Sequence, residues 1–499
     1  MKHQTATIVA ILGAFVCLAT LDAALAQNDG AADVDALIGG FEDGAPAGDD
    51  LEDAVRGFEQ TPAQAMEPPP EEDDILRGFE PDAAADMPPS PEAIQPSPLS
   101  LEGEFSFTTL FGLSPDAHSP WGGLNMVRPE LELILKSRFS DKWQGQISAR
   151  GVHDPVYAIR GRDDYSLQVL DEYEEEFELK DTFVQGSLTN ALDAKIGRQT
   201  VVWGTLDNIR ATDVLNPLDR RLPGLTDIED LRLPVTMAKF DYYVGSWDLS
   251  GMAIPEVRFS KLPAFGSDFF PSPSPLPQED APDDGLENAQ YAAALTGVFS
   301  GWDIAFYWAD IYADQSYVES VSREAADQFI RRYSRIKMLG TAANLAAGNW
   351  LLKAEAACFD GLRYTNRPHT DHVRLDLATG VEYAGFSEAA VSLEAVNRHL
   401  FDYDSLLEQA PDAVRRDAFQ WALRITRDLL NDTLTLGLLA AAFGFAGEDG
   451  AFERLDAEYD ITDAVSIRTG AVVYQSGEKG QLKEVGGNDR LFAVLTYHF

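Results

Sequence analysis

Charged and aromatic residues are concentrated between Gly197 and Arg232, where their types and spacing could select solutes by charge. The segment carries five arginines and six acidic residues, and apolar residues such as Val201 would be poorly placed in open solvent. We expect it to fold inward, because opposed charges across a narrow, low-dielectric passage create a field that sorts solutes. An ordinary outer loop with surface ion pairs is the alternative. The predicted constriction residues are Arg198, Trp203, Arg210, Asp213, Asn216, Asp219, Arg220 and Arg221.

Histidines offer the other candidate chemistry. His369 and His372 flank Asp371 closely enough to suggest a metal site. Neighbouring side chains in a strand or loop point apart, however, and no fourth ligand is visible nearby, so we favour a solvated loop tip and expect no metal or other cofactor. No histidine stands in a recognisable catalytic signature with serine or aspartate, and the chain is therefore not expected to be an enzyme.

The elements that would position these residues are amphipathic strands. Between Glu130 and Arg138, leucines alternate with polar and charged residues, which predicts one apolar and one polar face. The same pattern recurs at 144–150 and 465–474. Such strands are required in a wide, water-filled barrel that sits in lipid. The sequence thus predicts an all-β fold, a transmembrane antiparallel β-barrel.

The chain ends on an alternating strand from Leu491 to Phe499, which is long enough to cross a bilayer core when tilted. A closed barrel accounts for an apolar strand at the end of the chain, because the last strand must pair with the first. Tyr497 and Phe499 resemble the terminal aromatic signal of Gram-negative outer-membrane proteins, which the barrel-assembly machinery reads.

Short turns predict the number of strands. Four turns are followed by a tryptophan, and these would form a girdle at the periplasmic rim: Trp143, Trp247, Trp302 and Trp350. Four more turns fall near residues 189–190, 384–385, 431–432 and 462–463. With a first strand near Glu104–Gly112 and the terminal strand, the count is about 18, with 16 as the alternative. An even number places both ends of the barrel in the periplasm.

Long connections would then lie on the outer side. They are predicted near residues 114–127, 154–173, 201–231, 257–287, 313–331, 361–370, 399–413 and 477–487. Residues 318–333 could form a short helix in one of them, because Val318, Val321, Ala325 and Phe329 would share a helical face.

Residues 1–26 have the features of a secretory signal peptide, with Lys2 before an apolar run and small residues up to Ala26. Its removal would leave Cys358 as the only cysteine, so no intramolecular disulfide is expected. Residues 27–103 are rich in alanine, proline and acids, and we predict a disordered N-terminal periplasmic tail. Residues 104–499 are predicted to form the barrel.

Three near-copies of a Gly-Phe-Glu motif interrupt this tail, each preceded by aliphatic residues. Aromatic anchors repeated along a flexible acidic chain can dock a partner with increased avidity. Phe41, Phe58 and Phe79 are therefore the predicted docking residues. The alternative is a spacer whose apolar residues are incidental.

The net charge of −43 is unevenly distributed. Residues 27–100 carry 19 acidic and 2 basic side chains, or −17, and residues 1–26 are neutral, which leaves −26 for residues 101–499. Such a surface repels phosphates, so nucleic acid is not an expected partner. No stretch after the signal reaches the roughly 18 apolar residues of a transmembrane helix.

The segment 197–219 also resembles a known family. Its Gly-Arg-Gln, Val-Val-Trp-Gly and Asp-Val-Leu-Asn-Pro-Leu-Asp motifs are similar to those of an uncharacterised family of proteobacterial outer-membrane barrels, whose members are often encoded beside exporters of the RND superfamily (MMPL-like). The tail repeats are similar to Gly-Phe-Asp/Glu repeats in some members. The resemblance implies a transport role and supplies no catalytic residues.

Together these features predict a channel in the outer membrane of a Gram-negative bacterium, surrounded by lipid. It would pass hydrophobic or amphiphilic cargo and work with a periplasmic or inner-membrane RND-type pump through its tail. A general diffusion porin for small polar solutes is the main alternative. A structural or adhesive barrel and an outer-membrane enzyme are less favoured.

Overall fold

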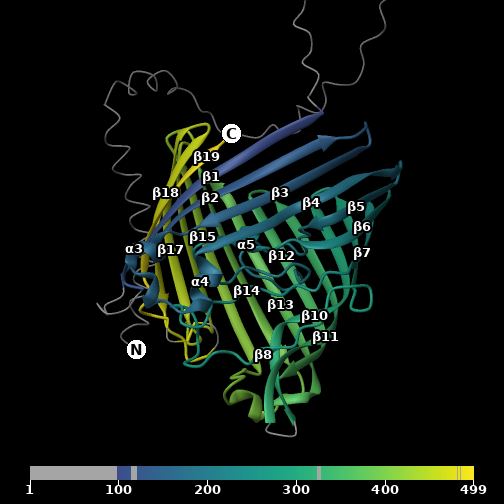
Figure 1. Ribbon diagram of the computed structural model, residues 1–499. Coiled ribbons are helices and arrows are strands. Elements are labelled where there is room, and N and C mark those ends of the chain that lie inside the picture. Colours follow the sequence, from purple (N-terminus) through teal and green to yellow (C-terminus); the bar gives the residue numbers. More distant parts are fainter. Residues whose placement is uncertain (1–97, 114–120, 323–326, 480–481, 484) are drawn as a thin grey trace, which may run out of the picture. The chain divides into compact units, whose positions relative to one another are not determined.

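The sheet closes on itself. The structure, a computed structural model, describes residues 98–113, 121–322, 327–479, 482–483 and 485–499. The first strand, β1 (Leu99–Gly112), pairs with β2 (Gly123–Arg138) on one side and with the last strand, β19 (Arg490–His498), on the other. β1 thus begins before the predicted Glu104. Figure 1 shows these two ends of the sheet side by side.

The remaining wall strands pair antiparallel with their neighbours along the chain. They are β3 (Trp143–His153), β4 (Glu175–Thr189), β5 (Leu192–Gln199), β6 (Val235–Val244), β7 (Trp247–Ile254), β9 (Gln290–Phe299), β10 (Trp302–Ser322), β11 (Asp327–Ala347), β12 (Trp350–Tyr364), β13 (Arg367–Phe386), β14 (Ala389–Leu400), β15 (Asp417–Leu429), β16 (Leu434–Phe443), β17 (Ala451–Thr462) and β18 (Val465–Gln475).

One further strand, β8 (Gln278–Glu279), lies in a connection and pairs only with β11, in parallel. Without it, the 19-stranded sheet leaves 18 wall strands in the described part of the chain. The predicted fold class, a closed antiparallel barrel of about 18 strands, is therefore confirmed.

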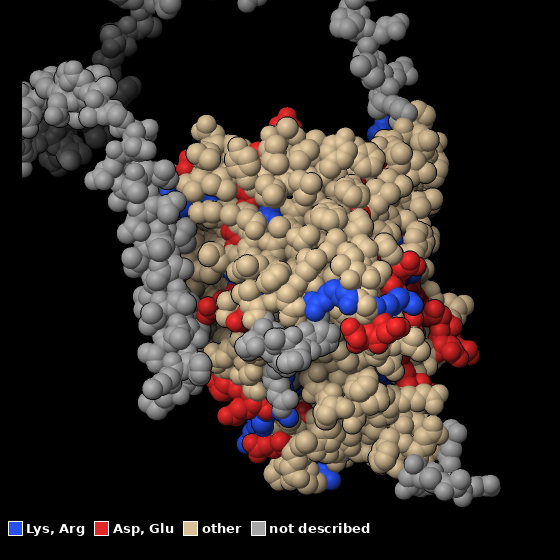
Figure 2. Space-filling view, turned by 60° about the vertical axis from the view of Figure 1, so that its left-hand side comes forward, with Lys and Arg blue, Asp and Glu red and all other residues tan. Residues whose placement is uncertain are grey.

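Side chains alternate between the outer face and the lumen along each strand. In β19, Leu491, Leu495 and Tyr497 are exposed on the outside, whereas Arg490 and Phe492 are buried on the inside. In Figure 2, the part of the barrel near the short turns is largely tan, and charged side chains gather toward the long connections. An apolar belt on a closed barrel is the arrangement that crosses a membrane.

The predicted short turns are confirmed to within a few residues. Strands β3, β7, β10 and β12 each begin at the predicted tryptophan. The turns join the strands pairwise, so that β1 and β19 leave the barrel at the same end.

Two predicted outer connections are in fact strand. Residues 313–322 continue β10 and residues 327–331 belong to β11, and the predicted helix at 318–333 is wrong, because Val318 pairs with Arg331 and Val321 with Gln328 across the hairpin. Residues 361–370 likewise extend β12 and β13, which turn tightly between Tyr364 and Arg367. Spacings of three and four residues fit a helix locally, but here ladder pairing and β-branched residues favour the strand.

The described helices are short and lie in the connections. They are α3 (Val156–Arg160), η3 (Arg162–Asp164), α4 (Leu167–Tyr173), α5 (Ile228–Leu231) and η4 (Ser405–Glu408). Among the residues with described structure, no helix has both the length and the apolar character needed to cross a membrane.

Candidate functional site

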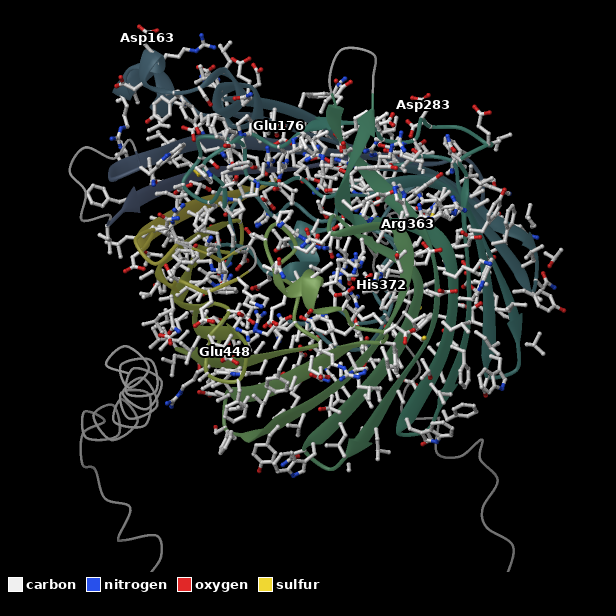
Figure 3. The ribbon with its side chains drawn as sticks, turned by 90° about the horizontal axis from the view of Figure 1, so that it is seen from below. Asp163, Glu176, Asp283, Arg363, His372 and Glu448 are labelled. Atoms are coloured by element: carbon white, nitrogen blue, oxygen red, sulfur yellow. The ribbon has the colours of Figure 1, made fainter. Side chains whose placement is uncertain are left out.

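The loop 200–234 connects β5 to β6 but makes its main contacts elsewhere in the barrel. Its hydrogen bonds reach β12, β14, β15 and β17, which lie across the ring from β5 and β6. Figure 3, viewed toward the end with the long connections, shows coil segments enclosed by the ring of strands. The loop therefore folds inward, as its apolar residues led us to expect.

A buried glutamate on β12 holds the first half of the loop. The Glu355 carboxylate accepts hydrogen bonds from the backbone N–H groups of Thr205 (2.6 Å), Leu206 (3.0 Å) and Thr212 (3.0 Å), and from the Thr212 hydroxyl (2.7 Å). Charge-assisted bonds of this kind are about twice as strong as neutral ones. One side chain of the wall thus fixes two points of the loop.

A second buried glutamate, on β14, repeats this arrangement. Glu394 is fully buried and accepts the N–H groups of Asp207 (2.8 Å) and Asn208 (2.9 Å). The Asp207 carboxylate in turn contacts the ammonium group of Lys353 on β12. Neither glutamate was among the predicted site residues, because on the sequence each is simply a polar residue on the inner face of a strand.

The second half of the loop is held by an aspartate at the start of α5. Asp227 accepts hydrogen bonds from Arg424 on β15 (3.0 Å) and from Arg454 on β17, whose guanidinium also contacts Asp456. Burial alone would raise the pKa of Asp227, but the charges of Arg454 and Arg424 outweigh it and hold that pKa below its usual range.

The two ends of the loop are joined near the wall. The Asn216 side chain accepts the Val201 N–H (2.8 Å) and donates to the Leu233 carbonyl (2.9 Å). Trp203 stacks on Tyr307 of β10 at 4.7 Å between ring centroids. These contacts close the loop around an apolar cluster that continues into the barrel wall.

Buried ion pairs occupy the middle of the loop. The Asp213 carboxylate contacts both Arg210 (3.1 Å) and Arg232 (2.9 Å). Burial lowers the pKa of the Arg210 guanidinium, and its Nη2 donates to the Asn216 carbonyl at 2.8 Å. The opposed charges expected in this segment are therefore paired with one another.

Arg220 and Arg221 face different neighbours. Arg221 is buried and contacts Asp219 (2.6 Å) and Glu176 of β4 (2.8 Å), whereas Arg220 is partly exposed and pairs with Asp314 of β10 (3.0 Å). Burial alone would raise the pKa of Asp219, but hydrogen bonding to Arg221 and its charge hold that pKa below its usual range.

Four of the eight predicted residues line one pocket of about 460 Å³ between the loop and the wall: Arg210, Asp213, Asn216 and Arg220. Arg221 and Asp219 belong to the cluster beside β4. Trp203 packs on Tyr307, and Arg198 pairs with Glu256 at 3.1 Å.

The wall side of this pocket combines arginines with apolar residues. Arg374 and Arg398 contribute guanidinium groups, and Ile311, Phe359 and Leu362 contribute apolar surface. We did not predict these residues from the sequence, because they lie on distant strands and only the barrel brings them to the loop.

The two histidines lie on β13 and differ in burial. His369 is exposed, with Glu319 at 3.6 Å, whereas His372 is buried and contacts the edge of the Tyr364 ring. The predicted solvated loop tip is thus wrong for His372, because the strand continues past it. Within the described residues, no group of three or more His, Cys, Asp or Glu side chains is placed to hold a metal ion.

Two other predicted sets lie at the chain ends. Tyr497 and Phe499 stack at 5.6 Å on the outer side of the terminal strand. Phe41, Phe58 and Phe79 fall outside the described residues.

The family model for "Protein of unknown function (DUF1302)" matches residues 124–499. No curated protein matches the chain. Among solved structures, it is similar to OccAB3 of Acinetobacter baumannii (12% identity, TM-score 0.48, covering 80% of this chain and 99% of that one). It is also similar to a BenF-like porin from Pseudomonas fluorescens Pf-5 (11% identity, TM-score 0.49, covering 81% and 99%). A third is OccK2 of Pseudomonas aeruginosa in complex with glucuronate (12% identity, TM-score 0.48, covering 80% and 98%).

Proposed function

We propose that this chain, which belongs to the DUF1302 family, is an outer-membrane channel whose lumen is narrowed by the loop 200–234. The observation that carries the proposal is the set of contacts from this loop to Glu355, Glu394 and Arg454 on the far wall. A loop fixed across the inside of a wide barrel reduces the open cross-section and sets the charges that a solute meets.

The pocket between loop and wall supports a cargo with both apolar and polar parts. Ile311, Phe359 and Leu362 line it beside the guanidinium groups of Arg374 and Arg398. An amphiphile could place its hydrocarbon part on the first group and its polar part on the second. We therefore favour hydrophobic or amphiphilic cargo.

A general diffusion porin for small polar solutes is the second candidate. It is favoured by the many paired charges on the inner face of the wall, such as Lys239 with Asp241 and Arg468 with Asp456. A polar, hydrated inner surface of this kind suits small hydrophilic solutes.

We further propose that the tail connects the channel to a periplasmic partner. The three Gly-Phe-Glu repeats would dock an RND-type pump through Phe41, Phe58 and Phe79, and Tyr497 and Phe499 would serve as the barrel-assembly signal. Both ends of the barrel would then lie in the periplasm.

Conductance of the purified protein in planar bilayers tests the channel. We expect discrete conductance steps that increase when the loop is released, and a lumen that stays closed in every variant would contradict the proposal. Deleting residues 33–82 tests the tail. Retained conductance with lost export of amphiphiles from cells supports docking, whereas unchanged export rejects it.

A further inference from the structure

One side of the barrel wall is incomplete toward the long connections. The β3–β4 ladder extends to Glu175, but the β4–β5 ladder begins only at Thr182. Residues 175–179 therefore pair with β3, and among the described strands none pairs with their other side. β10 similarly continues beyond Asp310, its last residue paired with β9.

Side chains, instead of a backbone ladder, fill this gap from the lumen. In the segment 255–262, Arg258 contacts Glu178 of β4, and Lys261 contacts Glu176 and Glu178. On the other side, the Ser260 hydroxyl donates to Asp314 of β10 at 2.7 Å. Opening this part of the wall would therefore require ion pairs to separate but no backbone ladder to come apart.

A groove of about 570 Å³ lies on the outer face next to this edge. Phe105, Leu131, Gly151 and Phe177 stand opposite one another on β1 to β4, and Gly151 interrupts this apolar row. Phe177 is 79% exposed, and a Cβ atom at Gly151 would meet nothing within 4 Å. Glycine thus leaves an open floor between the side chains of Leu131 and Phe177.

The groove has one polar end. His153 lies 3.3 Å from Glu175, just past Gly151 and Phe177 along the strands. Beyond them comes the unpaired edge of β4, whose N–H and C=O groups would be costly in hydrocarbon unless water or a polar group meets them. An apolar groove beside a polar gap fits an amphiphile that has one hydrocarbon chain and one polar head group.

We propose that this groove holds the hydrocarbon chain of a single-chain amphiphile as it passes between the lumen and the membrane across the unpaired edge of β4. The inference rests on the amphiphilic cargo proposed above. The hydrocarbon chain lies over Gly151, between Leu131 and Phe177, while the head group exchanges with Glu176 and Glu178 as the partner of Arg258 and Lys261 inside. The exchanged ligand is thus an acyl-chain amphiphile with an anionic head.

Two photoreactive palmitates test this route on the full chain in detergent micelles. A diazirine at the chain end should label residues around Phe177 and Leu131, and a diazirine beside the carboxylate should label the segment 255–262. Labelling of the outer face alone by both probes would overturn the crossing, and no labelling of the groove would overturn the site.

Gly151→Trp should fill the groove and lower chain-end labelling about tenfold. Gly251→Trp is the matched control, because Gly251 lies on β7 and a Cβ there also meets nothing within 4 Å. Equal labelling of the two variants would refute the groove. If Gly151→Trp does not fold, as judged by heat-modified gel migration, Gly151→Leu replaces it.

Competition and conductance separate the remaining outcomes. Unlabelled palmitate should displace the probe, and equal displacement by phosphatidylcholine would reduce the groove to an ordinary membrane-lipid contact and overturn the proposal. Labelling that requires dissociation of an oligomer would assign the groove to a second copy and also overturn it. Conductance should be unchanged in Gly151→Trp, so a wild-type chain without conductance refutes the channel and leaves the labelling result intact.

Discussion

Each strand of the barrel wall is held by its two neighbours through backbone hydrogen bonds, whereas the loop 200–234 is held largely by side chains. β13, for example, shares ladders with β12 and β14 over most of its length. The loop depends instead on a few carboxylates, chiefly Glu355, Glu394 and Asp227. We therefore expect that the loop can be released without opening the barrel. In the proposed channel, this difference would separate the wall that crosses the membrane from the loop that selects.

The largest expected effect comes from Glu355→Ala. The change leaves the N–H groups of Thr205, Leu206 and Thr212 without their acceptor, which should weaken loop docking by about 3 kcal/mol. Single-channel conductance should rise, and amide hydrogen exchange should speed up in the loop but not in the strands. Glu382→Ala is the control, because among the described residues Glu382 forms an ion pair with Lys353 at 3.5 Å and none with the loop. Unchanged conductance in Glu355→Ala would contradict the view that side-chain contacts hold the loop in the lumen.

Adjacent arginines provide a sharper test. Arg221→Ala removes a buried partner of Asp219 and Glu176 and should loosen the loop by about 2 kcal/mol, the value of a hydrogen bond to a charged group. Arg220→Ala removes a partly exposed pair with Asp314 and should cost no more than about 1 kcal/mol. Single-channel conductance and ion selectivity measure the effect of each variant. A larger effect of Arg220→Ala would show that Arg220, and not Arg221, holds the loop.

Acid should release the loop before it opens the wall. The folded pKa values of Asp219 and Asp227 lie below the unfolded value of about 3.9, so their stabilisation is complete above that pH and is lost as the pH falls through the folded values. Conductance should therefore be constant from pH 7 to about pH 4 and should rise below it. The double variant Asp219→Asn, Asp227→Asn should show this acid-induced rise much reduced, and an unaltered acid response would implicate other groups.

The smallest effect is expected on the outer wall. Leu133→Ala shortens a side chain that is already 38% exposed and should leave conductance and heat-modified gel migration unchanged. Leu133→Arg at the same position should cost about 2–4 kcal/mol if this face lies in lipid near the bilayer midplane. Similar stability of the two variants in liposomes would place that face outside the membrane.

The strands of the wall were largely predictable because the alternation of apolar and polar residues can be seen within each short segment of the sequence. Alternation at 130–138 and the tryptophans after the turns are visible in the sequence, and they gave the fold class and the strand number. The helix predicted at 318–333 failed because only the partner strand decides between two local readings. Cross-strand pairing is information that a single segment does not carry.

The loop was predictable only in part. Its apolar residues indicated inward folding, and Arg210, Asp213, Asn216 and Arg220 do share a pocket. Its anchors, Glu355 and Glu394, lie some 150 to 190 residues further along the chain. In the sequence, an acidic residue on the polar face of a strand is equally compatible with contact to water. Only the three-dimensional structure distinguishes a buried hydrogen-bond acceptor from a hydrated one.

The seam between the first and last strands has one more consequence. Gly103 and Phe499 exchange two backbone hydrogen bonds of 2.8 and 2.9 Å, so that the ladder between the first and last strands continues to Phe499. The wall's hydrogen bonding therefore does not require the chain ends to lie between β19 and β1. A circular permutant that links Phe499 to Leu99 and starts at Lys142 should refold in detergent into the same cylinder, where the proposed C-terminal assembly signal is not needed.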